Sequence, residues 1–248
     1  MSEPTTSLWL VFFAASMTAL STGLGALPFF FIKDINKQWL GIGNAIAAGL
    51  MLGASLGLFY EGFSEGWLRL ILGIIAGIVL IRLANNFLES RDDIQIGELP
   101  NADAAKMLLI VGVMTVHSFA EGIGVGVSWG GGQSLGSLIN IAIAIHNIPE
   151  GLAISLVLIP RGVSALRAAG WAVFSSLPQP LLAVPAFLFV LLFRPFLSFG
   201  FGLAGGAMVW MVFRELMPDA LEQISGRTAY STMAVAVAGM LLFQALIG

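Results

Sequence analysis

The sequence predicts an all-α membrane protein that crosses the bilayer eight times. Of its 248 residues, 58% are hydrophobic and only 10% are charged, whereas soluble domains average about 25% charged residues. The chain also divides into eight apolar runs, each close to the roughly 20 residues that a spanning helix needs. The predicted spans are 8–32, 40–60, 66–86, 105–128, 134–158, 167–191, 196–217 and 229–247. They make one transmembrane domain over 1–248, because the longest polar stretch is too short to build a core of its own.

Three features of the first half of the chain bear on the predicted topology. We interpret the first run as a retained helix and not as a signal peptide, because no basic segment precedes it. The second contains AAGLMLGASLGLFYEG, which resembles AGGAMVWMVFRELMPDA in the seventh. These two helices would run in opposite directions, so we expect an inverted repeat that pairs helices 1–3 with 6–8 around a central helix 4–5 pair. The acidic loop after the third, 87–104, is interpreted as a solvated cytoplasmic connector, with a cation-collecting surface as the alternative.

The fourth and fifth spans concentrate the polar residues that lie at membrane depth. The fourth reads MTVHSFAEG and the fifth reads IAIHNIPEG, so the pattern H-x-x-x-E-G occurs twice and uses both histidines of the protein. Residues four apart share one helix face, which pairs His117 with Glu121 and His146 with Glu150. Ser118 and Asn147, three residues before the glutamates, lie close to the same faces.

The depth of these residues indicates a metal site. Each histidine is about 12 residues into its span, roughly 18 Å along the axis and near the middle of a hydrocarbon core about 30 Å thick. Two imidazoles and two carboxylates at one depth suit zinc, and also cadmium, iron(II), manganese, nickel or cobalt. Pro149 adds to this prediction, because a proline inside a helix kinks it and frees the carbonyl four residues back, here that of Ile145. A hydrogen-bonded pair between helices is the alternative for either His–Glu pair alone.

The sixth span is expected to be irregular, because it contains Pro178, Pro180 and Pro185. Basic residues predict the orientation of all eight spans. Only Arg69 and Arg194 fall in the even-numbered loops. The odd-numbered loops and adjoining helix ends hold the other nine, which are Lys33, Lys37, Arg82, Arg91, Lys106, Arg161, Arg167, Arg214 and Arg227. We therefore expect both termini outside and the odd loops in the cytoplasm.

The segments HSFAEG and HNIPEG resemble the paired fourth- and fifth-helix motifs of the ZIP (Zrt/Irt-like) metal transporters, in particular the bacterial-type branch. The resemblance covers the whole chain. It implies uptake of zinc and related divalent ions toward the cytoplasm, in the plasma or inner membrane. It also implies a pathway between the fourth and fifth helices, with His117, Glu121, His146 and Glu150 as the principal metal ligands.

The resemblance implies further metal ligands as well. In the family a second, adjacent position shares the two glutamates and adds an Asn, a polar residue and a sixth-helix Glu. Here Asn147 fits, but Ser118 replaces the Asn and Gln179 stands where Glu is expected, which favours one bound ion. Glu215, near the cytoplasmic end of the seventh helix, would be an exit-side position, with a helix-end carboxylate or an ion pair with Arg214 as the alternative. Glu61 and Glu65, just after the second span, are interpreted as a solvated loop, with attraction of cations at the entrance as the alternative.

Composition limits the other function classes. A net charge of −3 argues against nucleic-acid binding, and the absence of cysteine excludes disulfides, thiolate metal sites and cysteine nucleophiles. An intramembrane zinc metallohydrolase remains the alternative to a transporter, although H-x-x-x-E differs from the zincin motif H-E-x-x-H. A channel or a metal sensor is not excluded. We expect metal ions as substrate, lipid as surroundings, no organic cofactor and no enzymatic activity; the oligomeric state is open, with a homodimer among the alternatives.

Overall fold

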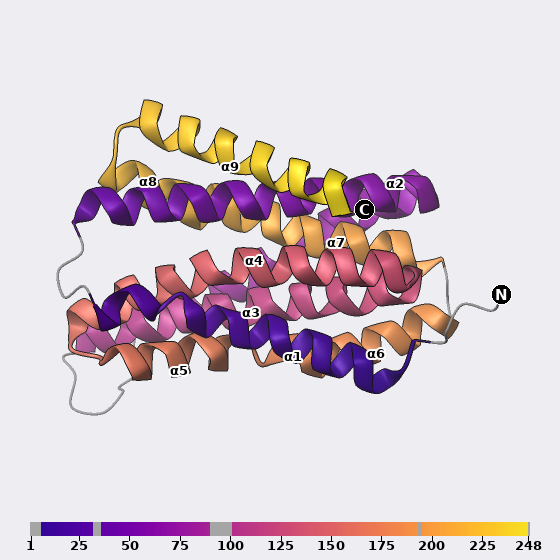
Figure 1. The fold of residues 1–248 in the computed structure, drawn as a ribbon, viewed down its shortest axis with the longest axis horizontal. Coiled ribbons are helices and arrows are strands. Elements are labelled where there is room, and N and C mark those ends of the chain that lie inside the picture. The colour runs from indigo at the N-terminus through magenta and orange to yellow at the C-terminus, as the bar shows by residue number, and fades with distance from the viewer. Residues whose placement is uncertain (1–5, 32–35, 90–100, 193–194, 248) are drawn as a thin grey trace.

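The computed structural model describes residues 6–31, 36–89, 101–192 and 195–247. Every regular element in this part of the chain is helical, and the helices run roughly along one axis (Figure 1). The α-helices are α1 (Leu8–Leu24), α2 (Lys37–Glu89), α3 (Asn101–Gly131), α4 (Gln133–Leu158), α5 (Ala165–Ser176), α6 (Pro178–Leu192), α7 (Phe196–Met211), α8 (Met217–Gln223) and α9 (Gly226–Ile247). Short 3-10 turns at Leu27–Phe30 and Ile159–Arg161 and a π-helical turn at Val212–Leu216 complete the set.

The helices have the length and surface of membrane spans. In the described residues, five stretches are long and apolar enough to cross a bilayer: Lys37–Leu83, Gln133–Leu158, Ala165–Leu192, Phe196–Gln223 and Gly226–Leu246. Large apolar side chains face outward, as at Trp9 (71% exposed) and Leu192 (87% exposed), which a soluble monomer would not tolerate over such an area. The predicted class, an all-α membrane protein, is therefore confirmed.

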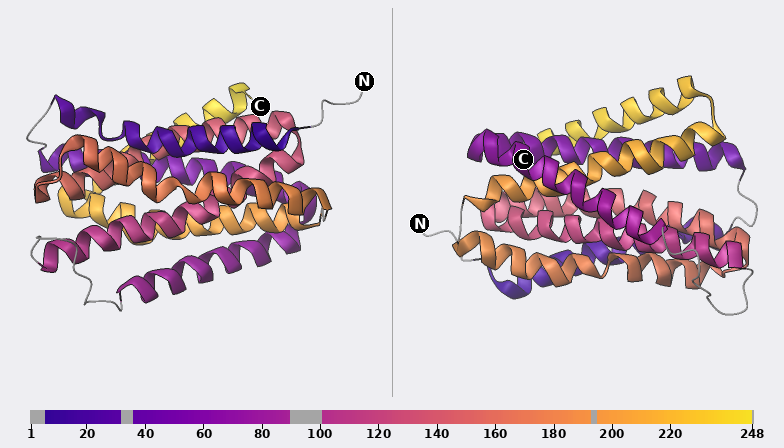
Figure 2. Two further views of the ribbon diagram at one scale, coloured as in Figure 1. Left: turned by 90° about the horizontal axis from the view of Figure 1, so that it is seen from below. Right: turned by 180° about the vertical axis from the view of Figure 1, so that it is seen from behind.

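The second and third predicted spans are joined without a loop. Helix α2 includes both, and it is interrupted at Gly66, whose φ of 147° and ψ of 97° lie outside the helical region. Glycine reaches this positive φ readily because it has no Cβ. The chain reverses its direction there, and the two halves of α2 form a hairpin (Figure 2). Both halves pack on α7, where a Cβ at Gly205 would meet Phe59 and one at Gly206 would meet Ile74.

Two helices end at positions that differ from the ends of the predicted apolar spans. Helix α1 ends at Leu24 and not at residue 32, because Pro28 has no N–H to donate to the Leu24 carbonyl. The chain then lies against the α4 backbone, where a Cβ on Gly25 would lie 2.1 Å from the Leu152 nitrogen. The sixth predicted span is divided at Leu177 into α5 and α6. Pro178 begins α6, in accordance with the irregularity that the prolines predict.

Helices α3 and α4 form the centre of the bundle. Helix α4 is mostly buried and α7 is buried to a similar extent, whereas α9 is mostly exposed and lies at the edge of the molecule (Figure 1). Glycine permits close contacts in the centre, since a Cβ on Gly126 would lie 2.1 Å from the Ala183 carbonyl oxygen of α6. Polar side chains on α3 and α4 are thereby enclosed by α1, α6 and α7.

Candidate metal site

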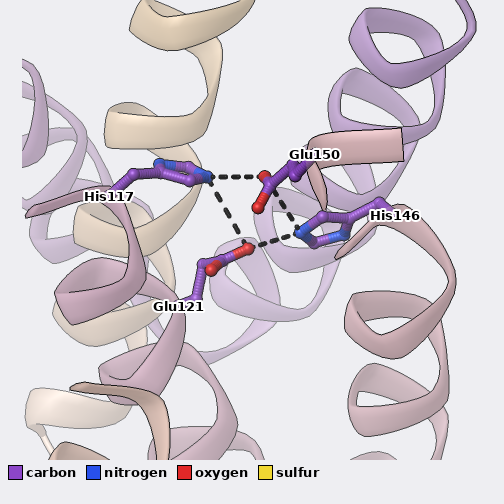
Figure 3. Close-up of side chains that lie close together, drawn as sticks. All are labelled: His117, Glu121, His146 and Glu150. Carbon is purple, nitrogen blue, oxygen red and sulfur yellow. Dashed lines mark hydrogen bonds and ion pairs between the residues drawn. The ribbon is translucent and has the colours of Figure 1, made fainter. Parts of the chain in front are cut away.

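Two histidines and two glutamates meet between α3 and α4. His117 and Glu121 come from α3, and His146 and Glu150 from α4. Each histidine Nε2 faces an oxygen of both carboxylates, so that nitrogen and oxygen atoms alternate around a ring (Figure 3). The Nε2–Oε1 distances are 3.6 Å for His117–Glu121, 3.2 Å for His117–Glu150, 2.5 Å for His146–Glu121 and 3.8 Å for His146–Glu150. One ligand atom from each residue lies within 4.8 Å of all the others.

The site is enclosed. His117, Glu121 and His146 have no exposed surface, and Glu150 is 2% exposed. Two carboxylates at this depth are costly unless positive charge and hydrogen bonds compensate them. Although His117 Nε2 and Glu150 Oε1 lie 3.2 Å apart, neither atom makes a hydrogen bond of acceptable geometry, and both are buried. A cation at the centre of the ring would give both atoms a partner.

The glycines that follow the glutamates allow other helices to approach. A Cβ on Gly122 would lie 2.8 Å from the Gln179 carbonyl oxygen, and one on Gly151 would lie 1.6 Å from the Thr22 carbonyl oxygen. The H-x-x-x-E-G pattern thus combines two ligand types with a contact surface one residue later. Helix α4 continues without interruption through Pro149, so the predicted free carbonyl does not come from a helix break.

A hydrogen-bond network surrounds Glu121. The Gln179 amide nitrogen, in the first turn of α6, donates to Glu121 Oε2 at 2.6 Å. Gln179 Oε1 accepts from Thr18 Oγ1 at 2.6 Å and from Asn147 Nδ2 at 3.2 Å. Asn147 Nδ2 also donates to the Thr18 main-chain oxygen at 2.8 Å. The structure therefore places Gln179 and Asn147 beside the four-residue ring, and Ser118 is buried next to His117.

Two cavities lie at opposite ends of α4. The first, of about 720 Å³, is lined by Glu61, Glu65 and the start of α4 as far as Ile139. The second, of about 380 Å³, is lined by Ala153, Met114 and the carboxyl end of α4, together with Glu215, Asp219 and Glu222. Among the residues that the structure describes, none lines both cavities. Glu215 thus lies in the second cavity and outside the four-residue cluster.

The second cavity comes closer to the ring than the first one does. Met114 and Ala153, which line the second cavity, are three residues from His117 and Glu150, less than one helical turn. The deepest α4 residue of the first cavity, Ile139, is seven residues before His146, or roughly 10 Å along the helix. Phe201, which has no exposed surface, also lines the first cavity.

Sequence reasoning missed Thr18, whose hydroxyl and carbonyl both belong to the Glu121 network. The only signal in the sequence was a hydroxyl residue within an apolar run. Its partner, Gln179, is 161 positions away along the chain. The acidic residues of the predicted loop between α2 and α3 mostly lie outside the described residues, so the cation-collecting surface stays a prediction.

The fold and this site define a class: an all-helical membrane protein with a buried His/Glu cluster that suits a divalent metal ion. Residues 88–246 match the family described as ZIP Zinc transporter. Zinc transporter ZupT of Xanthomonas axonopodis pv. citri is 31% identical over 261 residues, covering 96% of both chains. Zinc transporter GufA of Myxococcus xanthus is 29% identical, covering 83% of this chain and 86% of its own. The chain belongs to the ZIP family.

A plant relative is more similar over a smaller share of its length. A candidate zinc transporter of Arabidopsis thaliana is 48% identical over 227 residues, which are 90% of this chain but 36% of the plant protein. This chain therefore spans about a third of that relative. It spans nearly the full length of the bacterial ones.

Proposed function

We propose that this protein carries zinc across a membrane and holds the ion between His117, Glu121, His146 and Glu150. The spacing of their ligand atoms carries the proposal. Four ligands about 2.1 Å from a tetrahedral zinc ion lie about 3.4 Å from one another. The four Nε2–Oε1 distances around the ring range from 2.5 to 3.8 Å, and all four ligand atoms lie within 4.8 Å of one another. The site is thus close to the size that zinc requires. Cadmium, iron(II), manganese and cobalt are the other candidates for this N2O2 set.

We further propose eight crossings of the plasma or inner membrane, with both termini outside. The crossing segments are α1, the two halves of α2, α3, α4, α5 with α6, α7 with α8, and α9. The start of α1 and the end of α9 lie at the same end of the bundle (Figure 1), as an even number of crossings requires. An inverted repeat remains part of this proposal, because α2 and α7 pack on each other on one side of the central pair.

The two cavities support transport by alternating access. We infer that the cavity with Glu61 and Glu65 opens outside and that the cavity with Arg161 and Glu215 opens to the cytoplasm. The ion site lies nearer the second, so the protein is in a state closed toward the outside. A channel is less well supported, because the two cavities share no lining residue.

The metallohydrolase alternative lacks a general base. Both carboxylates in the cluster face histidine nitrogens across the ring, and in the described part of the chain the cluster has no third carboxylate. No observation favours peptide or ester cleavage over transport. The alternative predicts metal-dependent cleavage by the purified protein, which transport does not.

A flux assay tests the proposal. Purified protein in liposomes should take up Zn²⁺ or Cd²⁺ faster than empty liposomes do, and the protein carrying His146→Ala should not differ from empty liposomes. Iron(II), manganese and cobalt complete the panel. Absence of flux for all five ions, with correctly inserted protein, would contradict the transporter function.

A further inference from the structure

Glu121 is connected to α1 by a chain of amide groups that runs through three other residues. The order is the Thr18 main-chain carbonyl, the Asn147 side-chain amide, the Gln179 side-chain amide and Glu121 Oε2, with donor–acceptor distances of 2.8, 3.2 and 2.6 Å. All four side chains are buried. These hydrogen bonds join α3 and α4, which carry the ring, to α1 and α6, which help to enclose it.

The direction of this chain is fixed at its first member. A main-chain carbonyl can only accept hydrogen bonds, so the Asn147 atom that faces it must be the amide nitrogen. The second hydrogen of that nitrogen points to Gln179, which must then present its oxygen to Asn147. The Thr18 hydroxyl has one hydrogen and lies 2.6 Å from this oxygen and 2.7 Å from the Ala15 carbonyl oxygen, so the orientation rests on the Thr18 carbonyl. The Gln179 nitrogen is consequently directed at Glu121.

The amide determines which oxygen of Glu121 faces the ion. Oε2 is occupied by the Gln179 donor, while Oε1 faces His146 and His117. Resting on the proposed transport function, we propose that Gln179 is a positioning residue that holds Glu121 with one oxygen toward the ring. Gln179 touches Glu121 and not the ion. We propose as well that the site takes a single metal ion because position 179 supplies no third carboxylate.

Charge supports the restriction to one ion. Glu121 and Glu150 together carry −2, which balances one dication. A second dication on the outer side of Glu121 would have to displace the Gln179 amide, and at 4 Å it would repel the first about four times as strongly as unit charges do. Glutamine supplies a hydrogen-bond donor where that ion would lie and supplies no negative charge.

The first test measures zinc flux as a function of zinc concentration. Gln179→Met retains the length of the side chain and removes the donor, and Asn147→Leu removes the group that fixes the direction of the amide. Each should raise KM about tenfold, the factor that corresponds to 1.4 kcal/mol, which is close to the value of a hydrogen bond to a charged group. The double variant should be no worse than the worse single variant, because both act through Glu121. The control is Thr22→Val, which removes a buried hydroxyl bonded to Ser176 one turn further along α1 and should leave KM unchanged.

The second test counts bound zinc and does not depend on flux. Purified protein is dialysed against zinc and its metal content is measured, and the content of the same protein carrying His146→Ala is subtracted. The original chain and Gln179→Met should bind one zinc ion at the site. Gln179→Glu, which has the same shape and therefore the best chance of folding, should bind two.

The outcomes separate the two proposals. A wild-type protein without flux refutes the transport function, while the zinc count still tests the role of Gln179. Two zinc ions in the wild type, or one in Gln179→Glu, would overturn the restriction to one ion. An unchanged KM in Gln179→Met, or multiplied effects in the double variant, would overturn the positioning role.

Discussion

At the scale of single residues, the buried ring depends on the alternation of imidazole and carboxylate. Each glutamate has two histidines as neighbours, so loss of one carboxylate leaves both imidazoles with less compensation. Removing one partner from a buried charged cluster costs about 3–5 kcal/mol. Replacement of any one of the four ring residues should therefore weaken the whole metal site.

Glu121→Gln is expected to weaken zinc binding at least about 100-fold, because each 1.4 kcal/mol corresponds to a factor of ten. Competition against a fluorescent zinc chelator measures the change. Glu89→Gln, at the end of α2, is the matched control and should bind zinc as the wild type does. Equal losses in both variants would show that the ring is not where zinc binds.

The ring was predictable from sequence because its four members obey a local rule. His and Glu four residues apart share a face whatever the fold, and the two motifs have the same order. The network behind Glu121 was not predictable in the same way. Thr18 meets Gln179 only because α1 and α6 pack together, and a sequence contains no local signal for the meeting of two distant helices.

At the scale of elements, glycine determines how closely the helices pack. The division of α2 at Gly66 and of α5 from α6 before Pro178 follows from residues visible in the sequence. The end of α1 at Leu24 follows in the same way, because Gly25 comes directly after it and Pro28 cannot donate to the Leu24 carbonyl. The contact of Gly25 with the α4 backbone at Leu152 could not be predicted, because it depends on tertiary packing.

Gly151→Ala is expected to destabilise the protein by about 1–3 kcal/mol, because the new methyl group would lie 1.6 Å from the Thr22 carbonyl oxygen. In a chain of this length the apparent melting temperature in detergent should fall by roughly 2–12 °C. Gly170→Ala is the control. Nothing lies within 4 Å of its added Cβ, so its melting temperature should be equal or slightly higher. A loss in Gly170→Ala as large as that in Gly151→Ala would contradict the explanation by close packing.

At the scale of the whole molecule, the two cavities lie toward opposite ends of α4, with the ion site between them. No described residue lines both cavities. The chain has no cysteine, so single introduced thiols report on each cavity without background. Leu138→Cys places a thiol in the first cavity and Val157→Cys places one in the second.

A membrane-impermeant thiol reagent should modify Leu138→Cys in intact cells. It should modify Val157→Cys only in inverted vesicles, where the cytoplasmic side is exposed. The cysteine-free parent protein is the control and should not react in either preparation. Modification of both positions from one side would contradict the proposed topology.

The hydrogen-bond chain behind Glu121 begins at a peptide carbonyl, and this has an evolutionary consequence. Substitution at position 18 replaces the side chain but leaves the carbonyl that accepts from Asn147 in place. Substitution at position 18 therefore cannot reverse the donor–acceptor direction of these hydrogen bonds, whereas replacement of Asn147 or Gln179 can. Among descendants of this sequence, positions 147 and 179 should change together or not at all, while position 18 should vary among residues that keep a hydroxyl beside Gln179.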